Sequence, residues 1–139
     1  KIGIPSGIFT GNPVPENVEA FYSGALSKNL YLKALETVQN IFNGKHFNSA
    51  QTGLSFKQYL DYQNAIKGGV DLGSLINSQF SLSKNQASNL VQDFVQQVKS
   101  NNNVMLQAFD QLQKNVVLLK VDMMQALSIS VDYVDSDGD

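Results

Sequence analysis

The feature that most constrains the fold is an apolar pattern near the carboxyl-terminal end of the chain. Seven apolar residues recur at alternating spacings of four and three positions, the spacing of one helix face. They are Met105, Phe109, Leu112, Val116, Leu119, Met123 and Ala126. Such a stripe is typical of a helix packed lengthwise against other helices. The pattern therefore predicts a helical bundle.

Two earlier stretches have the same periodicity. One predicts a helix that starts at Asp71 and follows a nearly continuous stripe: Leu72, Ile76, Phe80, Ala87, Val91, Phe94 and Val98. The other predicts a helix that is capped by Ser27, ends at Gly44 and has one apolar face. That face consists of Leu30, Ala34, Leu35, Val38, Ile41 and Phe42.

The run Asn101–Asn103 separates the last two apolar stripes. It is either a turn with an N-cap or the middle of one very long helix. Three residues of low helix propensity in succession weaken a continuous helix, which favours the turn.

Shorter elements are expected around these helices. Residues 1–15 contain all three prolines and three glycines, which predicts a packed loop without a helix. A short helix is expected from Pro15 to Gly24. Another is expected after Ser55, where Gln58 completes a capping-box pattern and Phe56, Tyr59 and Leu60 form the inner face; residues 67–69, Lys-Gly-Gly, close it.

The tail changes period, because Ile129, Val131 and Tyr133 alternate with polar residues, which indicates a short extended segment. With 139 residues the chain is long enough for one domain. We therefore predict a single all-α domain over residues 1–139. It is a bundle of about five helices, the last two long, with a packed amino-terminal loop and a short extended tail.

Composition excludes several classes of function. The net charge is -2 and the chain has no arginine, which argues against nucleic-acid binding. It has no cysteine, which excludes disulfides and thiolate metal sites. No apolar run approaches the ~20 residues of a membrane-spanning helix. The first residue is Lys1 rather than Met, so we expect the chain to be part of a longer protein.

Few residues carry recognisable chemistry. His46 is the only histidine, and a loop position without a catalytic role is the simpler interpretation. Asp135, Asp137 and Asp139 alternate like the first ligands of a calcium loop, but Gly138 comes two positions early and no closing ligand follows. The three aspartates are candidate cation ligands, and a solvated terminus is the alternative. The residues supply no catalytic set, so we expect the chain itself not to be an enzyme.

Several stretches resemble the imelysin family of bacterial proteins, which includes insulin-cleaving membrane proteases and iron-regulated proteins. The matching stretches are KIGIPSGIF, VPENVEAFYSG, LETVQNIFNGK, TGLSFKQYLD and QKNVVLLKVDMMQALSISVDYVDSDGD. The ending is the most specific of them, with Lys120–Met123, then Ala126 and Leu127, and then the aspartate-rich close. The chain resembles the carboxyl-terminal half of such proteins.

The resemblance implies an all-helical cell-envelope protein of the periplasm or outer membrane, built from two halves and associated with iron uptake. The implied partner is the amino-terminal half of the same protein. Membrane association is expected only through a lipid anchor outside this chain. Full-length members could hold a metal ion, with iron, zinc and calcium all open.

Some family members are labelled metallopeptidases on the basis of a Gly-x-His-x-x-Glu motif in the amino-terminal half. The nearest string here, residues 44–49, has Ser49 where the motif has glutamate. The expected function is therefore a binding or structural module. The alternatives are part of a metallopeptidase whose site lies in the other half, and a free-standing calcium-binding helical domain.

Overall fold

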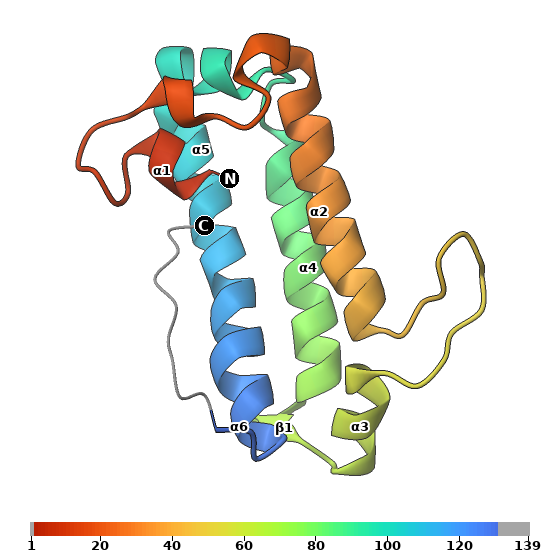
Figure 1. Cartoon of the computed structure of the whole chain (residues 1–139). Coiled ribbons are helices and arrows are strands. Elements are labelled where there is room, and N and C mark those ends of the chain that lie inside the picture. The colour runs from red at the N-terminus through yellow and green to blue at the C-terminus, as the bar shows by residue number, and fades with distance from the viewer. Residues whose placement is uncertain (1, 131–139) are drawn as a thin grey trace.

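The computed structural model describes residues 2–130 and contains three long helices that lie side by side (Figure 1). They are α2 (Ser27–Phe42), α4 (Leu72–Ser88) and α5 (Phe94–Val117). Helix α4 lies between the other two and packs against both. The predicted all-α bundle is therefore confirmed.

Shorter elements close the two ends of the bundle (Figure 1). At one end are α1 (Gly3–Ser6) and two 3-10 helices, η1 (Pro15–Asn17) and η2 (Phe21–Leu26). At the other end are α3 (Phe56–Tyr62) and the strands β1 (Ile66–Lys67) and β2 (Val70–Asp71). Helix α5 continues into a π-helical segment, η3 (Leu118–Met123), and then into α6 (Met124–Ala126).

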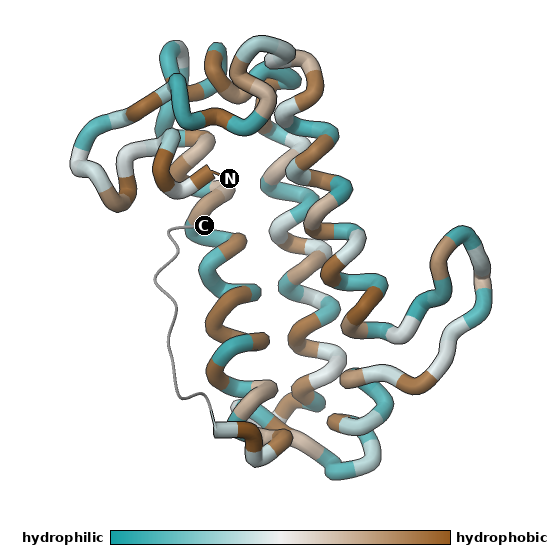
Figure 2. The backbone as a smooth tube through the Cα atoms, in the orientation of Figure 1, coloured by the Kyte–Doolittle hydropathy of each residue, from teal (hydrophilic) through white to brown (hydrophobic). Residues whose placement is uncertain are grey.

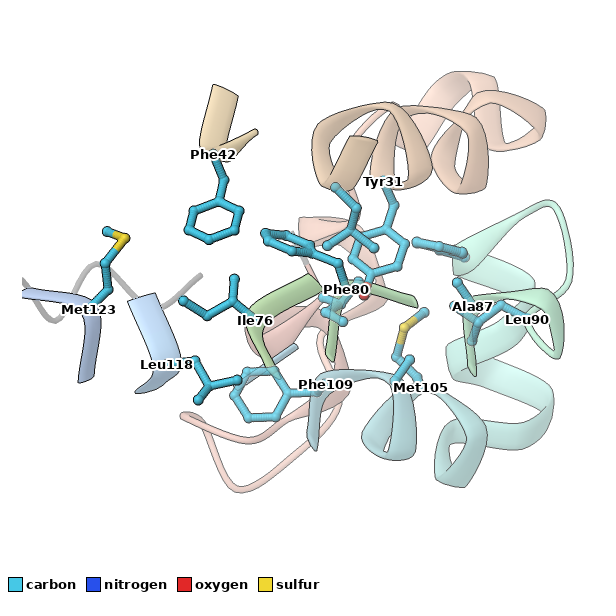
Figure 3. Close-up of a cluster of buried hydrophobic side chains, with 14 of the residues drawn as sticks. Tyr31, Phe42, Ile76, Phe80, Ala87, Leu90, Met105, Phe109, Leu118 and Met123 are labelled. Atoms are coloured by element: carbon cyan, nitrogen blue, oxygen red, sulfur yellow. The ribbon is translucent and has the colours of Figure 1, made fainter. Parts of the chain in front are cut away.

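The core runs between the three long helices (Figure 3). Ile76 and Phe80 of α4 are almost completely buried, as is Met105 of α5. Tyr31 of α2 packs edge-on against Phe94, with ring centroids 6.0 Å apart. Each fully buried side chain of this size contributes about 1.5–3 kcal/mol to folding, so this contact region is the main source of stability.

The apolar stripe of the last long helix is confirmed in outline but shifts in its final turns. Met105, Phe109 and Met123 are buried as expected, whereas Leu118 takes a buried position in place of Leu119. The π-helical segment explains the shift, because its hydrogen bonds span five residues and so place Leu118 and Met123 on one face.

The turn favoured at Asn101–Asn103 does not separate two elements, because α5 runs through these residues and has a kink at Asn101. Asn101 has φ -156° and ψ 77°, outside the helical region, and the helix resumes directly after it. The Gln97 side-chain amide donates to the Asn101 carbonyl oxygen at 2.7 Å. The Asn102 amide donates to the Ser6 carbonyl oxygen at 2.8 Å and so links the kink to α1.

The expectation of one nearly continuous stripe from Leu72 to Val98 is wrong at residues 89–93. Helix α4 ends at Ser88, and α5 begins after Asp93, whose side chain accepts hydrogen bonds from the N–H groups of Val95 and Gln96. This cap starts a new helix and leaves Val91 in the connection, where it is 41% exposed.

The prediction that residues 1–15 contain no helix is wrong for Gly3–Ser6, which form α1. Pro5 is compatible with this single turn because the N–H that it lacks would have no partner in a first turn. The predicted packing is confirmed for Ile2, which is completely buried, and Phe9 contacts Phe109 edge-on.

The helix expected from Pro15 to Gly24 is replaced by η1 and η2. Ala20 has a positive φ of 60°, which separates the two, and Gly24 lies inside η2 instead of ending a helix. Ser27 is the first residue of α2 and not its cap, because its hydroxyl donates to the Glu19 carbonyl oxygen at 3.0 Å.

The predicted apolar face of α2 is only partly correct. Leu35 and Phe42 are buried, but Leu30, Val38 and Ile41 are exposed, and Tyr31 is buried in their place. The reason is that α4 is the main partner of α2 among the long helices, so the bundle covers only a narrow stripe of the α2 surface.

The end of the short helix α3 also differs from expectation. The helix ends at Tyr62, and Leu60 is its only buried residue, since Phe56 and Tyr59 are about half exposed. Gly68 and Gly69 do not close the helix but form the turn between β1 and β2. Both have positive φ, at 58° and 80°, which favours glycine at the two positions.

The predicted cap at Asp71 leads to a test of helix α4. Asp71 accepts a hydrogen bond from the Ser74 N–H at 2.7 Å, and the hydrogen bonds from Ser74 hold the Asp71 pKa below its ordinary value. Asp71→Ala should lower the free energy of unfolding at pH 7 by about 1 kcal/mol in urea titrations. Asp110→Ala, at an exposed position within α5, is the control and should change it by less than about 0.5 kcal/mol.

The same cap has a predictable pH dependence. Because the folded-state pKa is the lower one, ionised Asp71 stabilises the protein fully above its unfolded pKa of about 3.9. That contribution is lost as the pH falls through the folded-state pKa. The difference between the wild type and Asp71→Ala should therefore shrink in acid, and a pH-independent difference would contradict this assignment.

Candidate functional site

The predicted cation ligands are not among the residues that the structure describes. Asp135, Asp137 and Asp139 lie outside the described residues, as do Val131 and Tyr133 of the expected extended segment. Within residues 2–130, no group of three or more His, Cys, Asp or Glu side chains could hold a metal ion. The candidate sites in the described part of the chain are therefore surfaces and clefts.

His46 lies in the loop of residues 43–55, which joins α2 to α3 and projects from the bundle (Figure 1). Backbone hydrogen bonds hold the loop in a hairpin-like shape. The His46 N–H donates to the Gln51 oxygen at 3.0 Å, and the Gly53 N–H donates to the Gly44 oxygen at 2.8 Å. The sole histidine therefore has a defined position beside α2.

Gly44 is required where this loop begins. Its φ of 66° lies in the left-handed region, and a Cβ atom there would be 2.7 Å from the carbonyl oxygens of Gly53 and Leu54. Any other residue would push the two arms of the loop apart.

An open cleft of about 640 Å³ lies between this loop and the second half of α2. We call it the α2–loop cleft. Its helix wall includes Lys33, Glu36, Asn40 and Ile41, and its other wall is the loop segment 45–50. Charged, amide, hydroxyl and apolar groups therefore all face one volume, which is of a size that binds small ligands.

The charges in the cleft are unevenly paired. Lys33 Nζ lies 2.7 Å from Glu36 Oε2. The hydrogen bond and charge of Lys33 lower the Glu36 pKa, with weaker help from Lys84 and Lys45. Glu36 is therefore ionised and already neutralised at pH 7, and it is the single carboxylate beside His46 in the lining. This set supplies binding groups but not the paired acid and base of a hydrolase.

A second feature is a group of exposed apolar side chains on residues 54–70, at the end of the bundle that carries α3 and the hairpin. We call it the distal apolar surface, and Figure 2 shows hydrophobic residues on this part of the chain. Tyr59 and Tyr62 stack on it with ring centroids 6.5 Å apart. Its members, with their exposed fractions, are Leu54 (97%), Phe56 (44%), Tyr59 (50%), Tyr62 (80%), Ile66 (62%) and Val70 (49%).

A smaller pocket of about 340 Å³ lies between the hairpin and α6. Lys67 of β1 and Asp122 of η3 line it and form an ion pair across it. The Asp122 side chain is only 17% exposed, so it is a largely covered partner of Lys67. The pair fastens the hairpin to the π-helical segment.

Amide side chains link the long helices, and the apolar pattern gave no sign of them. Asn43, directly after the end of α2, and Asn77 of α4 exchange two hydrogen bonds, at 2.8 and 2.9 Å. Between α4 and α5, Ser83 donates to the Gln111 carbonyl oxygen at 3.0 Å, and the buried Asn115 donates to Ser83. The chain is rich in Asn and Gln, but this composition does not show which of them form hydrogen bonds between helices.

Comparisons with known proteins found no match: no family model, no curated protein and no solved structure matches the chain. In the part of the chain that the structure describes, no helix is both long enough and apolar enough to cross a membrane.

The ion pair between Lys67 and Asp122 can be tested by a double-mutant cycle with Lys67→Gln and Asp122→Asn. We expect a coupling energy of up to about 1 kcal/mol in urea unfolding at low salt, because Asp122 is largely covered. The exposed pair Lys33 and Glu36, measured through Lys33→Gln and Glu36→Gln, is the control and should couple more weakly. Equal coupling energies for the two pairs would show that the burial of Asp122 has no effect.

Proposed function

We propose that this chain is the carboxyl-terminal helical half of an imelysin-like bacterial cell-envelope protein, in which it acts as a binding and structural module. The sequence resemblance supports the family. The distal apolar surface supports the role, because it is a feature of packed interfaces and is unusual on a protein exposed to water on all sides. This surface is the observation on which the proposal depends.

The physical argument concerns how many large apolar side chains stay in water. Isolated exposed apolar residues are normal on any protein, but clusters indicate an interface. Within the 17 residues from Leu54 to Val70, six large apolar side chains are 44–97% exposed. Covering them would remove apolar surface from water at about 25 cal/mol per Å², which favours a stable partner.

The proposed partner is the amino-terminal half of the same protein, as the resemblance implies. The proposed location is the periplasm or the outer membrane surface, with attachment through a lipid anchor outside this chain. A role in iron uptake is part of the same proposal. The neutral pairing of Lys57 with Asp61, 2.7 Å apart on α3, fits a protein interface better than a charged membrane surface.

The alternative is that the chain completes a metallopeptidase whose Gly-x-His-x-x-Glu site lies in the other half. Within residues 2–130, no group of three or more His, Cys, Asp or Glu side chains could hold a metal ion, which agrees with both functions because the peptidase site would lie in the other half. Metal analysis of the longer protein, with a peptide-cleavage assay on the wild type and on a variant with the motif histidine changed to alanine, separates the two functions. Metal-dependent cleavage lost in that variant would favour the peptidase.

The interface can be tested by purifying this chain together with the segment that carries the motif, as two polypeptides. Size-exclusion chromatography with light scattering should detect a 1:1 complex. Leu54→Ser combined with Tyr62→Ser should weaken the complex by tenfold or more, because the two most exposed side chains of the surface lose their apolar burial.

The matched control is Tyr22→Ser combined with Leu26→Ser, two exposed apolar residues at the opposite end of the bundle. These changes should leave the affinity within about twofold. A complex that is insensitive to Leu54→Ser and Tyr62→Ser, or no complex at all, would contradict the proposed role of the distal apolar surface.

A further inference from the structure

We propose that the α2–loop cleft binds small organic monoanions in which one carboxylate is attached to an apolar body. The cleft does not include the distal apolar surface defined above, so this inference does not depend on the proposed function. It rests on which charges in the cleft are already paired, on the exposure of its apolar side chains and on its volume.

The first step concerns charge. Lys33 and Glu36 neutralise each other at 2.7 Å. Among residues 2–130, Lys45 has no ion-pair or side-chain hydrogen-bond partner, although its backbone N–H is fixed by the Asn40 oxygen at 2.8 Å. The cleft therefore offers one positively charged group of fixed backbone position, and an anion is the ligand that pairs with it.

The second step limits the ligand to a single negative charge. Glu36 and Lys33 in the same lining are already paired with each other, so Lys45 is the lysine of the lining that remains for a ligand. A second negative charge on the ligand would have no partner there. The chain has no arginine, the residue that best matches a phosphate through two parallel hydrogen bonds. A carboxylate therefore fits the cleft better than a phosphate does. A cation is disfavoured because Glu36 is already paired.

The third step gives the ligand an apolar part. Ile41 and Phe47 belong to the lining, and their side chains are 61% and 92% exposed. If these side chains pack against an alkyl group of the ligand, apolar surface of both the protein and the ligand is removed from water. Asn40, Thr37 and Ser49 add hydrogen-bonding groups that can orient the carboxylate end.

Two sources have this chemistry: a fatty acid and the free carboxyl end of a peptide that ends in an apolar residue. Titration of the ¹⁵N-labelled chain with octanoate, and with acetyl-Ala-Ala-Leu, distinguishes them by amide shift changes. We expect saturable changes at residues 36–50 with at least one of the two, with a Kd in about the millimolar range for ligands of this size. Octanol and the peptide amide lack the charge and should bind at least about fivefold more weakly.

The decisive variant is Lys45→Gln, which should weaken binding of the carboxylate about fivefold, whereas Lys45→Arg should retain it. Lys99→Gln, an exposed lysine on α5, is the matched control and should bind like the wild type. Leu54→Ser with Tyr62→Ser should also bind like the wild type, which separates this site from the proposed interface. The proposal is overturned if neither carboxylate gives saturable shifts, if octanol binds equally well, or if Lys45→Gln has no effect.

Discussion

The structure depends on the burial of α4 between α2 and α5. Ile76 and Phe80 are almost completely buried there, and they hold both neighbouring helices through apolar contact. The same helix presents polar groups on both sides, because Asn77 accepts a hydrogen bond from Gln39 of α2 and Ser83 donates one to Gln111 of α5. Buried polar groups must find partners, so these bonds restrict how the helices can slide against α4.

The surfaces of functional interest follow from this central packing. Since α4 is the main partner of α2 among the long helices, the outer face of α2 stays uncovered and leaves Ile41 61% exposed at the α2–loop cleft. At the far end of the bundle, Leu60 anchors α3 in the core, while the neighbouring aromatic residues Tyr59 and Tyr62 remain in solvent. The folded chain is thus well packed inside and yet exposes a large part of its apolar side chains.

Sequence reasoning was most successful where a single local interaction decides the outcome. Asp71 begins α4 and Ser55 begins α3, because each side-chain oxygen accepts from an N–H three residues later. It was least successful where residues outside the helix itself decide the outcome. The hydroxyl of Ser27 bonds to Glu19, and the buried face of α2 turns toward Tyr31 because α4 lies on that side. The α2–loop cleft was not predicted, since only the fold places residues 45–50 beside α2.

The sequence by itself determined the all-α class and the presence of the long helices, because helix periodicity and propensity are properties of neighbouring residues. Only the tertiary structure decided which face of each helix is buried, where the amide contacts form and which apolar residues stay exposed. The physical reason is that burial depends on what lies opposite a side chain. In a bundle, the opposing residues come from helices that are distant in sequence.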